Sequence, residues 1–150
     1  MRLRPKSRAA VLIMVIGAAL ITWASKEESL DELKARADNA RTEDRPALCI
    51  EVAEHELKSA DQLYRSGDLD KARAAVAVVV DYSQQAFDAS TQTGKRLKKT
   101  EIALRKIAEK LRDIKETLNF ADQAPVQTAA DKLEKMRTDL LSQMFPRDHK

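Results

Sequence analysis

The residues with the clearest potential for chemistry surround His55, which has three glutamates within four positions of it. On a helix, Glu51 and His55 are one turn apart and can contact each other. A di-iron bundle would need a glutamate three residues before the histidine, and a zinc protease would need a second histidine four residues after it. Val52 and Ser59 occupy these positions. The sequence therefore predicts no metal site here and favours a solvated histidine.

Cys49 is the only cysteine, so it cannot form a disulfide within the chain. No second residue is placed to lower its pKa, so nucleophilic catalysis is not expected. Two interpretations stay open: a small buried apolar residue, the default for a free cysteine, and an intermolecular disulfide. The sequence also contains no Gly-rich phosphate loop, cysteine cluster or Ser-His-Asp arrangement. We therefore expect no catalytic residue, no cofactor and no enzyme activity.

A dense basic cluster comprises Lys95, Arg96, Lys98 and Lys99. Such a cluster can contact the phosphates of lipid headgroups at a membrane surface, or an acidic glycan. The alternative is a solvated helix start whose charge is balanced by a neighbouring acidic helix. No aromatic residue is interleaved with these cations, so nucleic-acid binding is not expected.

The first 24 residues have the pattern of an export leader. Four basic residues precede an uncharged run of 16 residues, 9–24. A secretory signal combines a basic start, an apolar core and a small-residue cleavage site, which predicts cleavage between Ala24 and Ser25. The alternative is an uncleaved membrane anchor with Trp23 at the outer interface. Both interpretations place the body of the chain outside the cytoplasm, in the periplasm or anchored to the inner membrane.

This leader also accounts for the basic character of the chain. The full sequence carries 27 Lys and Arg against 24 Asp and Glu, a net charge of +3. Residues 1–24 hold four of those bases and no acid, so the remainder has 23 bases and 24 acids. The net positive charge is thus not a sign of a nucleic-acid partner.

Apolar residues recur at intervals of three and four along the rest of the chain, which predicts helices throughout. The few glycines and aromatic residues also disfavour a sandwich or barrel. Residues 25–45 are expected to form a stalk or weak helix, and 46–145 an antiparallel helical bundle of about four helices, with a loose tail at 146–150. Within them, helices are expected at 29–42, from Pro46 to a break at Ser66, at about 69–90, at about 95–118 and at about 126–145.

The helix expected at 95–118 carries the cleanest apolar stripe, an unbroken alternation of threes and fours typical of a coiled-coil seam. This predicts a self-association seam made of Leu97, Leu104, Ile107, Leu111, Ile114 and Leu118. The same helix is strongly basic, and the helix that starts at Pro46 is acidic. Opposite charge is expected to make these two helices neighbours.

Small and apolar residues in the segment SADQLYRSGDLDKARAAV stand at the spacing of a tight helical hairpin: Ala60, Leu63, Gly67, Ala72 and Val76. These positions resemble a single tetratricopeptide unit over about residues 56–89. The resemblance implies two antiparallel helices with a small residue at each close contact, and a peptide-binding role. Any tight helical hairpin needs the same residues, and no second unit follows at the family's period.

The sequence therefore predicts an all-α, exported protein that acts by binding rather than by catalysis. The leading hypothesis is an interaction or scaffold protein of the bacterial cell envelope, with an unidentified protein or a second copy of itself as partner. The second hypothesis is a binder of anionic envelope ligands, which would use the basic cluster of Lys95, Arg96, Lys98 and Lys99.

Overall fold

The computed structural model describes residues 28–146, which form five helices and, within that range, no strand. The helices are α1 (Leu30–Asp38), α2 (Arg45–Ser66), α3 (Leu69–Thr93), α4 (Leu97–Glu116) and α5 (Phe120–Met144). The all-α prediction is therefore confirmed. The predicted leader, with its cleavage position between Ala24 and Ser25, and the last four residues of the predicted tail lie outside the described residues.

Short local signals in the sequence set the helix ends. The Ser29 hydroxyl accepts a hydrogen bond from the Glu32 N–H at 3.2 Å, and the Glu32 carboxylate accepts one from the Ser29 N–H at 3.1 Å. Ser29 and Glu32, three residues apart in the sequence, thus form a capping box at the start of α1. Gly67 ends α2 with φ at +81°, a conformation that L side chains rarely adopt. Asp68 then caps α3 by accepting from the Lys71 N–H at 3.5 Å.

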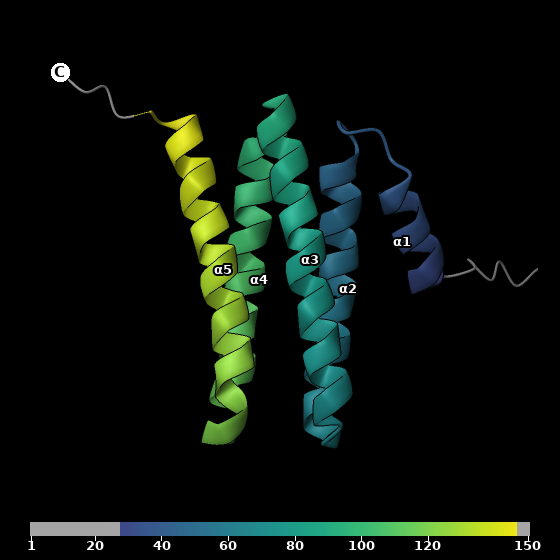
Figure 1. Cartoon of the computed structure of the whole chain (residues 1–150), viewed down its shortest axis with the longest axis vertical. Helices are drawn as coiled ribbons and strands as arrows, with labels where there is room; N and C mark the ends of the chain where they lie inside the picture. The colour runs from purple at the N-terminus through teal and green to yellow at the C-terminus, as the bar shows by residue number, and fades with distance from the viewer. Residues whose placement is uncertain (1–27, 147–150) are drawn as a thin grey trace, which may run out of the picture.

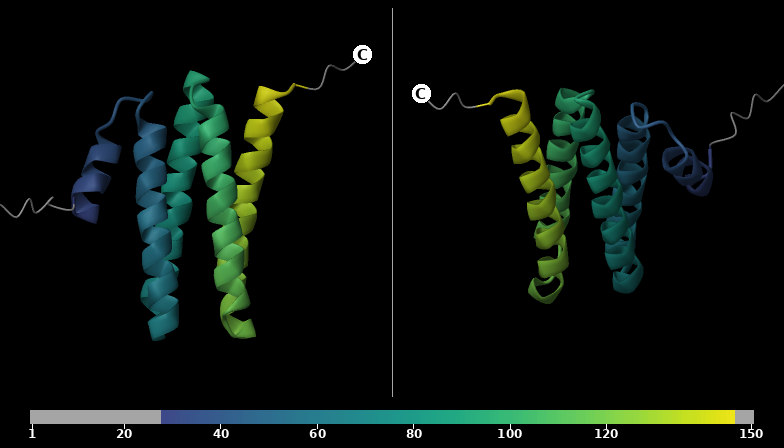
Figure 2. Two further views of the ribbon diagram at one scale, coloured as in Figure 1. Left: turned by 180° about the vertical axis from the view of Figure 1, so that it is seen from behind. Right: turned by 45° about the horizontal axis from the view of Figure 1, so that its top comes forward.

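The four long helices form two hairpins that pack side by side (Figures 1 and 2). Helix α2 packs mainly against α3, and α4 mainly against α5. Across the two hairpins, α3 lies beside α5 and α2 beside α4, and the shared direction of travel makes each of these pairs parallel (Figure 1). The chain crosses from one hairpin to the other at the α3–α4 turn, where Gly94 and Arg96 both have positive φ.

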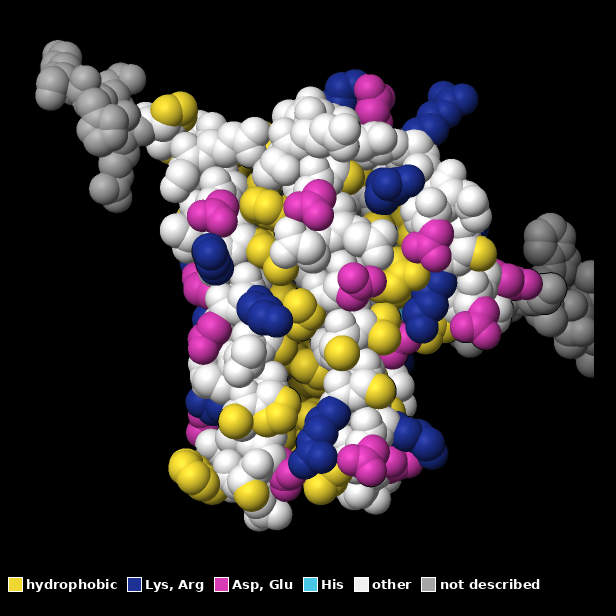
Figure 3. Space-filling model, viewed as in Figure 1, with side chains coloured by type: hydrophobic (Ala, Val, Ile, Leu, Met, Phe, Trp, Pro, Cys, Tyr) yellow, Lys and Arg dark blue, Asp and Glu magenta, His cyan; other side chains and the backbone are white. Residues whose placement is uncertain are grey.

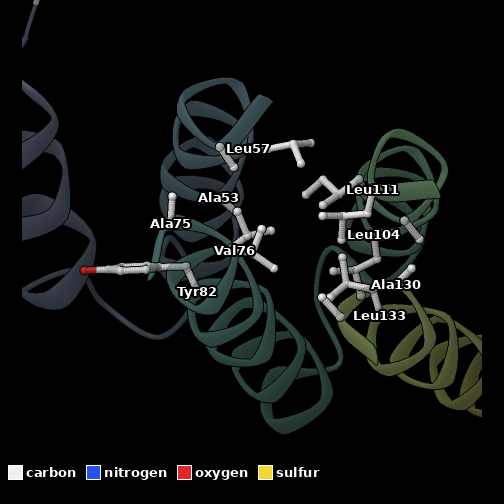
Figure 4. Close-up of a cluster of buried hydrophobic side chains, with 14 of the residues drawn as sticks. Ala53, Leu57, Ala75, Val76, Tyr82, Leu104, Leu111, Ala130 and Leu133 are labelled. Atoms are coloured by element: carbon white, nitrogen blue, oxygen red, sulfur yellow. The ribbon is translucent and has the colours of Figure 1, made fainter. Parts of the chain in front are cut away.

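One core runs through both hairpins. It includes Val76 of α3 and Leu104 and Leu111 of α4, which point into the space between the hairpins (Figure 4). Leu104, Leu111 and Leu133 are fully buried. Alanines at Ala53, Ala75 and Ala130 let the helices approach closely, as a bundle of long helices requires.

Helix α1 packs against α2 at the edge of this bundle (Figure 1). Its Leu33 and Ala37 are buried and belong to the common core. Tyr82 of α3 extends toward α1 (Figure 4) and donates a hydrogen bond to the Asp38 carboxylate at 3.1 Å. Burial, together with this bond, raises the pKa of Tyr82 to about 12.

Three boundaries differ from the predicted ones by three residues or more. Helix α1 ends at Asp38, four residues before the predicted end at 42, because the Asn39 side chain and backbone N–H both donate to the carbonyl of Ala35 and cap the helix there. Helix α3 continues to Thr93, because a buried hydrogen bond of 2.7 Å joins the hydroxyls of Ser90 and Thr100 and gives this polar segment a packed partner. Helix α5 begins at Phe120, and Pro125 lies inside it. Proline removes one helical hydrogen bond, whose acceptor would be the carbonyl of Ala121. Both residues are exposed, so water can reach that carbonyl.

Candidate interaction groove

The boundary between α3 and α5 is hollow. A groove of about 570 Å³ runs along it, visible as a strip of apolar side chains down the centre of the face in Figure 3. Helix α3 lines it with Ala77, Val80, Asp81, Gln84 and Phe87. Helix α5 lines it with Lys132, Lys135, Met136 and Asp139.

A second hollow of about 240 Å³ continues the groove toward the first turns of the two helices. It shares Ala77, Val80 and Lys132 with the larger hollow, so the two form one continuous surface, which we call the α3–α5 groove. It begins near Arg73 and ends near Phe87 along α3. Fourteen residue steps of a helix correspond to a length of about 20 Å.

Side-chain size explains why the groove is open. Ala77 on α3 and Ala129 on α5 face this boundary with side chains too short to fill it. Val80 and Phe87 pack partly against the core and leave part of their surface in the groove. The groove therefore has a partly exposed apolar floor between charged rims.

The rim of the groove carries charges that are not paired within the described part of the chain. Asp81, Lys132, Lys135 and Asp139 make no ion pair there. The Asp81 carboxylate accepts only a hydrogen bond of 3.1 Å from its neighbour Gln85. Acidic Asp81 lies on the α3 rim, while Lys132 and Lys135 lie on the α5 rim.

Direct polar contacts between α3 and α5 occur only near the ends of the groove, as far as residues 28–146 show. At one end, Arg73 forms an ion pair of 2.8 Å with Asp122. At the other end, the Gln143 amide donates to the carbonyl of Thr91 at 3.4 Å. No direct polar contact between the described residues of α3 and α5 crosses the middle of the groove.

The opposite face of α5 shows how a closed boundary looks in the same molecule. Arg137 of α5 pairs with Glu101 of α4 at 2.7 Å and with Glu134 of its own helix at 2.5 Å. Arg112 of α4 pairs with the same Glu134 at 3.0 Å. Burial alone would raise the pKa of Glu134, but hydrogen bonds from Arg137 and Arg112 outweigh it and hold the pKa below its usual value.

The predicted basic cluster is divided by the fold. The Lys95 ammonium pairs with the Glu43 carboxylate at 2.7 Å, and Arg96 donates to the Glu43 carbonyl at 3.2 Å. Lys98 and Lys99 are exposed and make no ion pair with any residue in the described range. Arg96 and Lys99 line a small apolar hollow of about 90 Å³ between α2 and α4. Two of the four cationic side chains thus already have partners within the chain.

The predicted self-association seam lies mostly inside the chain's own core. Leu104, Ile107, Leu111 and Ile114 are between 0% and 1% exposed. Leu97 and Leu118, at the two ends of the seam, are partly buried against the same core. No second copy is needed to cover these residues, so the apolar stripe of α4 is explained by intramolecular packing. Self-association itself stays a prediction.

The predicted neighbours α2 and α4 do contact each other, and the Lys110 ammonium lies 3.6 Å from the Asp61 carboxylate.

His55 lies exposed on α2, and residues 28–146 contain no group of three or more His, Cys, Asp or Glu that could hold a metal ion. Cys49 is 0% exposed, with its sulfur 4.0 Å from the Gln85 side-chain oxygen. Burial raises the pKa of the Cys49 thiol to about 11.

Sequence reasoning did not identify the α3–α5 groove as a site, although a signal for it is present. On α3, Ala77, Val80, Gln84 and Phe87 follow one another at intervals of three, four and three. This is a second stripe on a helix whose main stripe already faces the core. A helix with two such stripes has more apolar surface than one neighbouring helix can cover.

Comparison of the chain with models of known families, with curated proteins and with solved structures finds no match. Among the described helices, none combines the length and the apolar character that a membrane span requires.

Proposed function

We propose that this chain is a non-enzymatic interaction protein that binds an amphipathic helix of a protein partner in the α3–α5 groove. The observation that carries this proposal is the groove itself, which is about 20 Å long and has apolar residues on its floor. Four of its rim charges, Asp81, Lys132, Lys135 and Asp139, make no ion pair among the described residues. A helix of about four turns matches that length. Helix-in-groove docking is a common mode of peptide recognition.

The rim charges favour one orientation of the bound helix. Its basic residues would lie against Asp81 on the α3 side. Its acidic residues would lie against Lys132 and Lys135 on the α5 side. The apolar face between these charges would cover Val80, Phe87 and Met136, which provide most of the apolar area for burial. Charge complementarity at the rims would set specificity more than affinity.

The proposal includes an extracytoplasmic location, in the periplasm or at the inner membrane of a bacterial envelope. Its support is the basic start and the apolar run of residues 1–24. A reporter that is active only outside the cytoplasm, fused after Lys150, is expected to be active. N-terminal sequencing of the mature chain distinguishes cleavage before Ser25 from an uncleaved anchor. A reporter that is inactive in the full-length fusion would contradict export.

Site-specific photocrosslinking in the cells that produce the protein tests the groove. A photoreactive phenylalanine analogue at Ala77 lies in the groove and is expected to give a discrete crosslinked product. The matched control is Ala74, an exposed alanine on the same helix that does not line the groove. Equal crosslinking at the two positions, or none at Ala77, would remove the groove as the binding site.

The anionic-ligand hypothesis is the second candidate, and exposed Lys98 and Lys99 support it. It predicts salt-sensitive binding to vesicles that contain anionic lipid. Neutralising Lys95, Arg96, Lys98 and Lys99 together is expected to abolish that binding. Unchanged binding would exclude this hypothesis and leave the groove proposal untouched.

A further inference from the structure

We infer that the partner in the α3–α5 groove is a second copy of this chain, related to the first by a two-fold axis parallel to the helices. This inference rests on the proposed function, because it names the partner that covers the same groove, here with the paired α3 and α5 of a second copy in place of one inserted helix. It moves self-association away from the α4 seam, whose central residues are already covered within one chain.

The direction of the helices makes this arrangement consistent. Helices α3 and α5 run in the same direction on the grooved face (Figure 1). When two such faces meet across a two-fold axis parallel to the helices, α3 of one copy lies over α5 of the other, again in the same direction. Each copy then contributes the same surface, as a two-fold interface requires.

The rim charges are complementary in this arrangement. Asp81 on α3 and Lys132 and Lys135 on α5 line the same stretch of the groove, so they lie at similar heights along the helices. Asp81 of each copy therefore meets the two lysines of the other copy, and the two-fold axis produces this contact twice. Asp139 lies toward the end of the groove and adds no favourable pair.

The same arrangement covers the apolar floor. Because α3 of each copy lies over α5 of the other, Val80 and Phe87 of one copy would face the α5 side of the other copy's groove, which includes Met136. A heterologous partner helix would need basic residues on one side and acidic residues on the other. This chain already presents that combination on the grooved face itself.

A charge-swap experiment tests the inference. Sedimentation equilibrium of the full chain, in a non-ionic detergent that keeps residues 9–24 in solution, is expected to show a dimer at tens of micromolar. Asp81→Lys places like charges together at both contacts and is expected to weaken the dimer by about tenfold to 100-fold. The pair Lys132→Glu and Lys135→Glu is expected to weaken it similarly. Combining all three substitutions restores opposite charges between copies and is expected to restore the dimer.

Circular dichroism melting of each variant checks that the fold is retained, since the three residues are exposed and unpaired. A wild-type chain that stays monomeric at these concentrations overturns the inference, and so does a dimer that tolerates Asp81→Lys. Failure of the triple variant to regain the dimer also overturns it.

Crosslinking at Ala77 separates this inference from the proposed function. A crosslinked product with twice the mass of the chain, containing only its peptides, supports the second copy. A product that contains a different protein keeps the groove as a binding site and overturns the second copy. The absence of any product at Ala77 counts against both.

Discussion

Helix α5 meets α4 along a filled boundary and meets α3 along a hollow one. Its fully buried Leu133 and Leu140 belong to the core, and toward α4 it forms a network of ion pairs centred on Arg137. Toward α3 it places the short side chain of Ala129 and two lysines that make no ion pair among the described residues. One helix thus has one face that is closed by ion pairs and another that borders a groove.

Chain connectivity explains part of this difference. Helices α4 and α5 are consecutive and antiparallel, with a turn of three residues, 117–119, between them. Helices α3 and α5 are parallel and are joined only through the whole of α4. Antiparallel neighbours also place opposite ends of their helix dipoles together, which parallel neighbours do not. The contacts within each hairpin are accordingly the most extensive ones, and the helices of different hairpins pack less closely.

The largest expected effect compares one core residue with one groove residue. Leu104→Ala, in the core, removes a fully buried side chain and is expected to lower the free energy of unfolding by about 2–5 kcal/mol. Val80→Ala, in the groove, removes a partly exposed side chain and is expected to cost about 1 kcal/mol or less. Urea denaturation followed by circular dichroism measures both. Equal costs would show that the groove is packed as tightly as the core.

The second comparison concerns charge at the filled boundary. Glu101→Gln breaks the pair with Arg137 at a position where Glu101 is only 8% exposed. We expect this change to lower the free energy of unfolding by about 1–2 kcal/mol. Glu109→Gln is the matched control on α4, since Glu109 is exposed, and it is expected to stay within about 0.5 kcal/mol. If both variants cost the same, the ion-pair network does not hold the boundary.

The pH dependence of stability reports on the same network. The folded-state pKa of Glu134 lies below its usual value of 4.5, so Glu134 stabilises the fold above that pH. This contribution is lost as the pH falls through the lower, folded-state pKa. In Glu134→Gln, the free energy of unfolding is expected to fall less steeply with decreasing pH below 4.5. Thermal melts from neutral to acidic pH measure it, and parallel curves for both proteins would contradict the lowered pKa.

The smallest expected effect on stability comes from blocking the groove. Ala77 is exposed, and Ala77→Glu is expected to change the free energy of unfolding by less than about 1 kcal/mol. The same substitution places a charge on the apolar floor and is expected to abolish self-association. Ala74→Glu on the same helix is expected to leave both properties unchanged. Sedimentation and urea denaturation of the two variants, measured together, separate binding from stability.

Local signals in the sequence predicted much of the fold. Ser29 with Glu32, and Gly67 followed by Asp68, act within a few residues, so their effects do not depend on distant neighbours. The stripe through Leu104 and Leu111 correctly identified a buried face. The spacing along one helix does not indicate which helix packs against it. The stripe therefore could not show that these residues are buried by other helices of the same chain.

The groove and the basic cluster depend on contacts between segments far apart in the sequence. Lys95 pairs with Glu43, 52 residues away in the sequence. No local sequence pattern predicts a contact between residues so far apart. Val80 and Phe87 extend the apolar surface of α3 beyond the stripe that faces the core. Their partial exposure follows from the short side chains on the facing side of α5, which only the packing of the two hairpins brings opposite them.

The burial of Cys49 gives the molecule a built-in reporter of its own opening. Its sulfur lies between α2 and α3, near Gln85, and its pKa of about 11 keeps the thiol protonated at neutral pH. A thiol reagent can therefore reach it only when the helices that cover it separate. At saturating reagent, the labelling rate would equal the rate of that opening, and the measurement requires no engineered probe. A disulfide between the Cys49 residues of two chains would likewise form only after this opening.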